Sequence, residues 1–142
     1  MEEHVDTILR EIKTIAVVGL SRDPSKVSYS VAEYMRRSGY NIVPINPMTK
    51  EIMGSKCYSS ISALPDHLKD SIDLVNIFRK SADVNQIVME AIELRMMCSR
   101  PDVIWMQLGI FNQEAADHAL NAGMKVVMDR CIRTEHKRLG IK

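Results

Sequence analysis

Short apolar runs alternate with segments of helical periodicity along most of this 142-residue chain. Five runs are rich in Val and Ile and nearly continuous in apolar character: Thr14–Leu20, Asn41–Ile45, Ile72–Phe78, Asp102–Leu108 and Lys125–Asp129. Runs of this kind are typical of strands that are covered on both faces, as in a parallel sheet. The pattern therefore predicts five strands.

Four segments have the apolar spacing of a helix: residues around Val5–Ile12, then Ser28–Ser38, Ser81–Met97 and Asn112–Asn121. Ser81 and Asn112 are residue types that cap helix N-termini with their side chains, so both are expected to begin their helices. Residues 46–71 are less regular. They predict a short edge strand near Cys57–Tyr58 and one or two helical turns over Ile61–Leu68.

Strands that alternate with helices specify βαβ units. Right-handed crossovers place the helices on both faces, so the predicted fold class is α/β: a Rossmann-like, doubly wound, mainly parallel sheet. The length suits a single domain over residues 1–142. Ligands of such sheets bind outside the carboxyl ends of the strands, near the point where the strand order reverses. The candidate segments are therefore Gly19–Lys26, Asn46–Lys50, Phe78–Ser81, Gln107–Asn112 and Asp129–Arg133.

Positive and negative charges nearly balance, because 19 Lys and Arg against 18 Asp and Glu give a formal net charge of +1. This balance provides no field that would attract nucleic acid or a membrane surface. The longest apolar runs are far shorter than the ~20 residues that cross a bilayer. Cys57, Cys98 and Cys131 are widely spaced and lack metal-binding spacing, which predicts reduced thiols in a cytoplasmic protein.

The loop after the first predicted strand, GLSRDPSK, has features of a phosphate site. Gly19 permits a tight turn and a close approach of the backbone to a ligand. Ser21 offers a hydroxyl, the following helix begins with N–H groups that favour an anion, and Arg22 and Lys26 add positive charge. A phosphate or pyrophosphate fits this loop. The alternative is an ordinary βα loop whose Arg22 faces water.

Two dinucleotide features are missing from this region. Ser21 and Pro24 replace the second and third glycines of the GxGxxG fingerprint. The second strand ends at Asn46-Pro47, where a carboxylate would hold the ribose diol of NAD, and the next acidic residue is Glu51. A P-loop is absent as well. A ligand with a phosphate on its ribose suits the nearby basic residues better, among them Lys50 and Arg79.

Four blocks of the sequence resemble the small CoA-binding proteins of the YccU-like family. They are IAVVGLSRDPSK with its continuation to VPINP, DLVNIFRKS, IWMQLGIFNQEAA and VVMDRCI, in the family's order. The resemblance extends from about Thr14 to Arg138. It implies a Rossmann-like domain similar to the CoA-binding domain of the succinyl-CoA synthetase α-subunit and of ADP-forming acyl-CoA synthetases, with coenzyme A as its ligand.

The resemblance also implies roles for thirteen positions around the predicted strand ends. Gly19, Leu20, Ser21 and Arg22 would contact the CoA pyrophosphate. Asn46, Pro47 and Lys50 would lie by the adenosine and its 3′-phosphate. Phe78, Arg79 and Lys80 would flank the adenine and phosphates, and Gln107, Leu108 and Gly109 would line the path of the pantetheine.

The sequence shows no Ser-His-Asp pattern, no paired carboxylates on one predicted face and no metal-ligand cluster. In the synthetases that it resembles, acyl transfer depends on a phosphorylated His in a further domain, which this chain is expected to lack. We therefore expect a protein that binds CoA or acyl-CoA without catalytic machinery of its own. Two alternatives stay open: an NAD(P)-binding oxidoreductase-like domain, and a subunit of a split acyl-CoA synthetase. A homodimer is also open, because two-fold dimers are the commonest soluble oligomers.

Two features near the C-terminus have competing interpretations. Cys131 follows the last strand, where Arg130 and Arg133 would lower the pKa of a thiol at the mouth of the site. The alternative is a small buried Cys that packs under the sheet end. The basic stretch His136–Arg138 is too short for a nucleic-acid contact, and we expect it to be a solvated tail.

Overall fold

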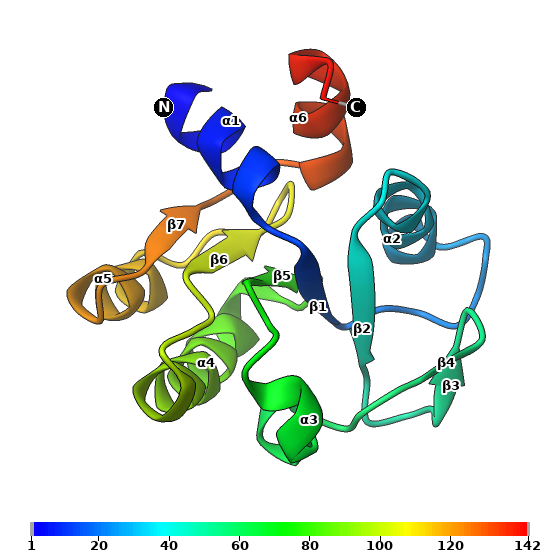
Figure 1. Cartoon of the computed structure of the whole chain (residues 1–142), viewed down its shortest axis with the longest axis horizontal. Helices are drawn as coiled ribbons and strands as arrows, with labels where there is room; N and C mark the ends of the chain where they lie inside the picture. Colours follow the sequence, from blue (N-terminus) through cyan, green and yellow to red (C-terminus); the bar gives the residue numbers. More distant parts are fainter. Residues whose placement is uncertain (1, 142) are drawn as a thin grey trace.

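The computed structural model describes residues 2–141 and contains one five-stranded parallel sheet (Figure 1). Its strands are β1 (Thr14–Val18), β2 (Asn41–Ile45), β5 (Leu74–Ile77), β6 (Val103–Met106) and β7 (Lys125–Val127). The strand order is β2-β1-β5-β6-β7, and every neighbouring pair is parallel. This architecture confirms the predicted α/β class.

Helices cover both faces of this sheet (Figure 1). The first face packs against α1 (Glu2–Glu11), α2 (Val27–Arg37) and α6 (Ile132–Leu139), and the second against α4 (Val84–Cys98) and α5 (Gln113–Asn121). The irregular segment folds as a small antiparallel hairpin, β3 (Glu51–Ile52) and β4 (Ser55–Lys56), followed by the 3₁₀ turn η1 (Ile61–Ala63) and by α3 (Asp66–Lys69). Tyr58 adds a single parallel bridge to Ile45.

Each strand supplies side chains alternately to two apolar cores. Ile15 and Val17 of β1 pack with the first face, whereas Ala16 and Val18 pack with the second. Trp105 of β6 is fully buried in the first core and donates its indole N–H to the carbonyl of Arg130 at 2.8 Å. Because both faces are covered, the strands read as continuous apolar runs.

The strand order reverses beside β1. The chain passes from β1 to β2 in one direction and later returns to place β5 on the other side of β1. Loops that leave the carboxyl ends of β1 and β5 therefore turn to opposite faces, and a crevice is expected between them. The candidate site lies in this position.

The two predicted helix caps have different outcomes. Asn112 caps α5, since its side-chain oxygen accepts a hydrogen bond from the N–H of Ala115 at 2.9 Å. The prediction for Ser81 was wrong: a 3₁₀ turn, η2 (Ser81–Asp83), precedes α4, and the Ser81 hydroxyl accepts from the N–H of Phe111 at 3.1 Å. Ser81 thus joins the loop after β6 to the start of α4.

The predicted solvated tail was wrong for His136, which is buried in α6, whereas Lys137 and Arg138 are exposed as expected. Ile132 and His136 lie one helical turn apart and are both buried against α1 and α2. His136 Nδ1 lies 2.8 Å from the hydroxyl of Tyr34, and the ring meets Tyr34 and Tyr40 edge to face. This side chain anchors α6 to the domain.

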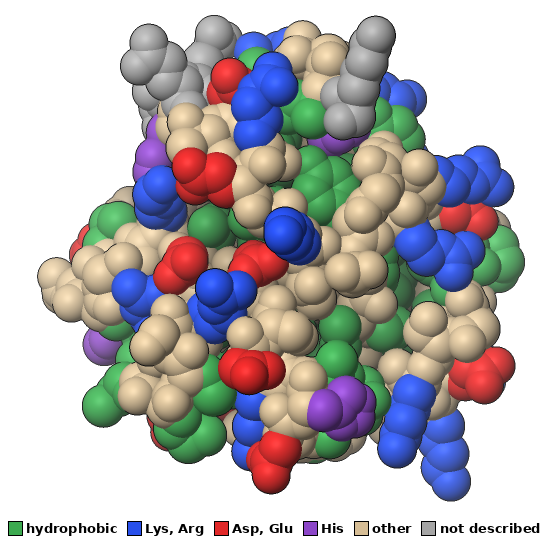
Figure 2. Space-filling model, in the orientation of Figure 1, with side chains coloured by type: hydrophobic (Ala, Val, Ile, Leu, Met, Phe, Trp, Pro, Cys, Tyr) green, Lys and Arg blue, Asp and Glu red, His purple; other side chains and the backbone are tan. Residues whose placement is uncertain are grey.

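Charged side chains of both signs are interspersed over the face shown in Figure 2. This distribution agrees with the formal net charge of +1. Within residues 2–141, no helix has the length and apolar character needed to cross a membrane.

The burial of His136 predicts a dependence of stability on pH. Burial lowers the pKa of His136 below its usual 6.5, so the unfolded chain takes up a proton at a pH where the folded protein does not. The free energy of unfolding should therefore be largest above pH 7 and should fall as the pH drops through 6.5. Urea unfolding at pH 7.5 and 5.5 measures this drop, which should be smaller in His136→Phe. An equal drop in both proteins would contradict this origin.

Candidate functional site

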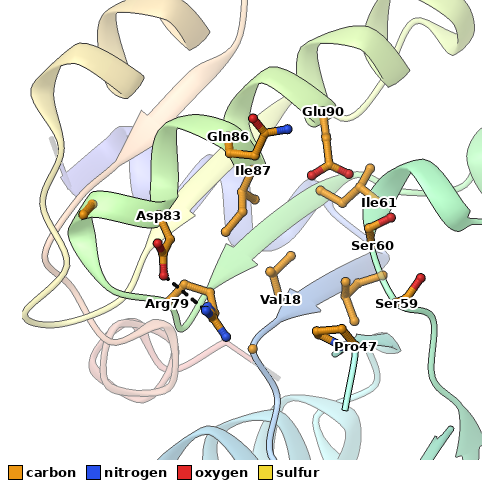
Figure 3. Close-up of a pocket in the computed structure, with 13 residues that line it drawn as sticks. Val18, Pro47, Ser59, Ser60, Ile61, Arg79, Asp83, Gln86, Ile87 and Glu90 are labelled. Atoms are coloured by element: carbon orange, nitrogen blue, oxygen red, sulfur yellow. Dashed lines mark hydrogen bonds and ion pairs between the residues drawn. The ribbon is translucent and has the colours of Figure 1, made fainter. Parts of the chain in front are cut away.

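A cavity of about 430 Å³ opens at the carboxyl ends of β1 and β2, on the side of the sheet that carries α4 (Figure 3). It lies between the strand ends, the segment before η1 and the first turns of α4. Its lining comprises Val18, Gly19, Ile45, Pro47, Ser59, Ser60, Ile61, Arg79, Ala82, Asp83, Gln86, Ile87 and Glu90. The volume is within the range of small-molecule sites.

Gly19 brings three strand ends together at this cavity. Its N–H donates to the carbonyl of Ile45 at 2.9 Å, and its φ of +85° is in the region that favours glycine. A Cβ at this position would stand 2.6 Å from the carbonyl oxygen of Phe78. The turn after β1 therefore requires glycine for its backbone angle and for its closeness to β5.

The cavity combines an apolar base with a polar rim. Val18, Ile45 and Ile87 are buried and supply apolar surface, while the hydroxyl-bearing Ser59 and Ser60 lie on the side of η1. In Figure 3 the strand end that carries Val18 lies between Arg79 on one side and the Ser59–Ile61 segment on the other. A ligand part with one flat apolar face and hydrogen-bonding edges suits such a lining.

Charges on the cavity lining are mixed. The Arg79 guanidinium lies 3.2 Å from the carboxylate of Asp83, four residues later. The carboxylate of Glu90 accepts hydrogen bonds from the N–H of Ser62 at 3.1 Å and from its hydroxyl at 2.8 Å. Glu90 thereby ties η1 to α4 and fixes the width of the cavity. One cation and two carboxylates give the lining a formal charge of −1.

The loop after β1 is held by its own hydrogen bonds. The Ser21 N–H donates to the Ser28 hydroxyl at 3.0 Å, and the Ser21 hydroxyl accepts from the N–H of Asp23 at 3.0 Å. The Ser25 N–H and hydroxyl donate to the Asp23 carboxylate, and these two bonds lower the pKa of Asp23. The hydroxyl groups of Ser21 and Ser28 therefore accept bonds that shape the loop.

Other predicted residues of this loop lie in different environments. Arg22 and Lys26 are exposed, whereas the Leu20 side chain is fully buried. The Leu20 carbonyl accepts from the side-chain amide of Asn46 at 2.9 Å, and the Asn46 oxygen accepts from the N–H of Met48 at 2.8 Å. Asn46 therefore joins the loops after β1 and β2.

The remaining predicted residues divide between the cavity and its surroundings. Gly19, Pro47 and Arg79 line the cavity, while Lys50 and Lys80 are exposed. The part-buried side chain of Phe78 packs on the core of the opposite face, although its carbonyl faces Gly19.

The segment after β6 lies outside the cavity lining. Gln107 is buried, and its side-chain oxygen accepts from the N–H of Ile132 at 3.0 Å, which caps α6. The Gly109 N–H donates to Asp129 at 2.7 Å. Leu108 is 70% exposed.

Sequence reasoning missed the wall formed by Ser59–Ile61 and the first turns of α4. Asp83, Gln86 and Glu90 follow the three- and four-residue spacing of one helix face, and this spacing was the available signal. The Ser59–Ile61 segment gave no comparable signal because it has no regular period.

Cys131 lies on the other face of the sheet, where it packs with the core of α1, α2 and α6. Burial raises the pKa of its thiol, but hydrogen bonds from Thr134 and Gln107 outweigh burial, and the net shift is downward. Arg130 instead pairs with Glu135 at 2.9 Å. Cys131 is not among the residues that line the cavity.

Comparison with known proteins identifies the family of this domain. The family model described as a CoA binding domain matches residues 13–137. The chain belongs to this CoA-binding domain family. The match confirms the resemblance found in the sequence and covers every element from β1 to most of α6.

The CoA-binding domain has relatives of two lengths. It is 36% identical over 132 residues to the uncharacterized protein YneT of Bacillus subtilis, and the matched region covers 93% of this chain and 91% of YneT. It is 33% identical over 78 residues to the ADP-forming acetate–CoA ligase of Methanocaldococcus jannaschii, and the matched region covers 55% of this chain and only 10% of the ligase.

Solved structures show the same division. A hypothetical protein from Pyrococcus horikoshii superposes with a TM-score of 0.88 at 34% identity, over 98% of this chain and 92% of that one. The dinucleotide-forming acetyl-coenzyme A synthetase 1 of Ca. Korarchaeum cryptofilum, in complex with phosphate and ADP, gives 0.65 at 28% identity, over 81% of this chain and 25% of the synthetase. The domain is thus similar to whole small proteins and to one part of larger enzymes.

Two glycine substitutions test the close approach at β1. Gly19 and Gly109 both have φ of +85°, but a Cβ at Gly109 would meet nothing within 4 Å. Gly19→Ala should therefore lower the free energy of unfolding by about 1–3 kcal/mol more than Gly109→Ala, because only Gly19 adds a clash to the backbone strain. Urea unfolding measures both. Equal losses would show that the Phe78 carbonyl moves away without cost.

Proposed function

We propose that this domain binds coenzyme A, with part of the ligand in the cavity and its phosphates over the loops after β1 and β2. The observation that carries the proposal is the position of the cavity at the strand-order reversal, where it is lined by Gly19 and Pro47. The loops that begin at these two residues carry the exposed cations Arg22, Lys26 and Lys50. This position is where doubly wound sheets bind nucleotides. Membership of the CoA-binding domain family supports the same ligand.

The charge layout supports an orientation for the ligand. On the lining, Asp83 and Glu90 outnumber the cation Arg79, so phosphate groups would be repelled from the interior of the cavity. Only the rim beside Arg79 offers a phosphate a positive charge. The adenine ring is uncharged, and its flat face suits the apolar surface of Val18 and Ile87. The phosphates would then lie outside, near the basic loops, where the N-terminus of α2 also favours an anion.

The pantetheine arm would leave the cavity along the surface of the carboxyl edge. Leu108 and Phe111 are exposed by 70% and 54% on the loop after β6. Ser81, which contacts this loop through the N–H of Phe111, connects it to the start of α4 beside the cavity. These apolar side chains provide a path for the arm that needs few specific bonds.

The proposed activity is binding of CoA or acyl-CoA, without a catalytic step performed by this domain alone. The two carboxylates on the cavity lining have structural partners: Asp83 pairs with Arg79, and Glu90 binds Ser62. The likeness to ADP-forming acetate–CoA ligases favours a second candidate, a subunit of a split acyl-CoA synthetase. Acyl-CoA formation only after addition of a partner subunit would support that candidate.

An NAD(P)-linked oxidoreductase is less well supported. The side-chain amide of Asn46 donates to the Leu20 carbonyl and accepts from the Met48 N–H. The end of β2 therefore carries an amide and not a carboxylate. A ribose diol would therefore lack the acceptor that holds it in dinucleotide sites.

Calorimetric titration with four ligands tests the proposed function. CoA should bind most tightly, and dephospho-CoA should bind more weakly because it lacks the 3′-phosphate that the basic loops would attract. NADP and ADP should both bind less tightly than CoA. Equal or tighter binding of NADP would overturn the assignment.

Substitution of Arg22 tests the placement of the phosphates. Arg22→Ala should weaken CoA binding by roughly fivefold at low salt, as expected for one exposed charge contact, and the loss should shrink as salt screens the charges. Arg37→Ala, which removes an exposed cation from the far end of α2, serves as the control and should leave the affinity unchanged. No change for Arg22→Ala would remove Arg22 from the site.

A further inference from the structure

Asp83 ends the 3₁₀ turn that leads into α4, and its backbone is already helical, with φ −90° and ψ −10°. A side chain caps a helix from a residue with extended backbone, so the Asp83 carboxylate makes no capping bond to the first turn of α4. Its carboxylate instead reaches back to the Arg79 guanidinium, at 3.2 Å (Figure 3). Asp83 is thus paired with Arg79 within the lining of the cavity.

The ion pair between Arg79 and Asp83 can be broken at little cost. Arg95, by comparison, donates to the carbonyls of Pro101, Ala122 and Gly123 as well as to the Asp102 carboxylate. Among residues 2–141, the Asp83 carboxylate is the one polar partner found for Arg79. Both side chains are nearly half exposed, at 48% and 44%. Exposed ion pairs of this kind contribute at most a factor of about five to an equilibrium constant.

We propose that Asp83 is an internal competitor for the phosphate of the ligand. In the empty site its carboxylate holds Arg79 at the cavity rim. A phosphate group of the bound ligand takes over Arg79, and the released carboxylate, which is already 44% exposed, turns to solvent. Arg79 thus exchanges one anion for another. This inference rests on the proposed function, since it concerns how the same site admits a phosphorylated ligand.

The exchange makes Asp83 a specificity-determining residue. A ligand without phosphate cannot displace the carboxylate and so leaves Arg79 paired. A phosphorylated ligand gives Arg79 a new anion in place of the carboxylate that it displaces. The rim of the cavity therefore favours the phosphorylated form of a ligand over its bare nucleoside, although the lining has a net negative charge.

The test is the substitution Asp83→Asn, which removes the competing charge and keeps the size of the side chain. Affinity for CoA should rise about twofold to fivefold at low salt, and the gain should shrink as salt is added. Affinity for adenosine, which has no phosphate, should stay unchanged. Asp66→Asn is the matched control, because it removes one exposed carboxylate from α3, away from the cavity lining, and should leave both affinities unchanged.

A double-mutant cycle with Arg79→Gln completes the test. Without the cation, Asp83→Asn should lose most of its effect on CoA affinity, because no pair remains to be released. If wild-type protein binds CoA and Asp83→Asn binds it no more tightly, the inference fails and the proposed function stands. An equal gain for adenosine and CoA would also overturn the inference, since it would indicate a general change in the cavity. Absence of CoA binding in the wild-type protein would overturn both proposals.

Discussion

The carbonyl oxygen of Phe78 leaves no room for a side chain at Gly19, and the site is organised around this contact. The Gly19 N–H binds the carbonyl of Ile45, and the Phe78 N–H binds the carbonyl of Val18. The ends of β2, β1 and β5 are therefore fixed within one hydrogen-bonded unit. Because the loops beyond β1 and β5 must turn to opposite faces, the space between them remains open and becomes the cavity.

The sheet could be predicted from sequence because both of its faces are buried. Every residue of β1 is buried, and alternate side chains serve separate cores, so the strand gives a continuous apolar signal. The same signal overstates strand length. Leu20 is fully buried yet lies beyond the end of β1, because it packs under α2 after the turn at Gly19. Apolar character indicates burial, whereas the hydrogen-bonded pairing of β1 with its neighbours ends at Val18, two residues before Leu20.

The parts that could not be predicted depend on contacts between distant residues. The Ser59–Ile61 wall is held by the bridge from Tyr58 to Ile45 and by the bonds from Ser62 to Glu90, 28 residues later. The N-terminus of α6 is capped by Gln107, which lies 25 residues earlier in the chain. The spacing of apolar residues along the chain does not reveal such distant pairs. The segment after β2 therefore seemed irregular, and the C-terminal helix resembled a polar tail.

Asn46 shows why the end of β2 carries an amide where a dinucleotide site would have an acid. The loop pair needs a group that donates to the Leu20 carbonyl and accepts from the Met48 N–H at the same time. An amide does both, whereas a carboxylate only accepts. A carboxylate here would face the Leu20 carbonyl with no proton between them, and the loops after β1 and β2 would separate. The residue that joins the loops after β1 and β2 therefore uses both ends of its side chain to bind the backbone.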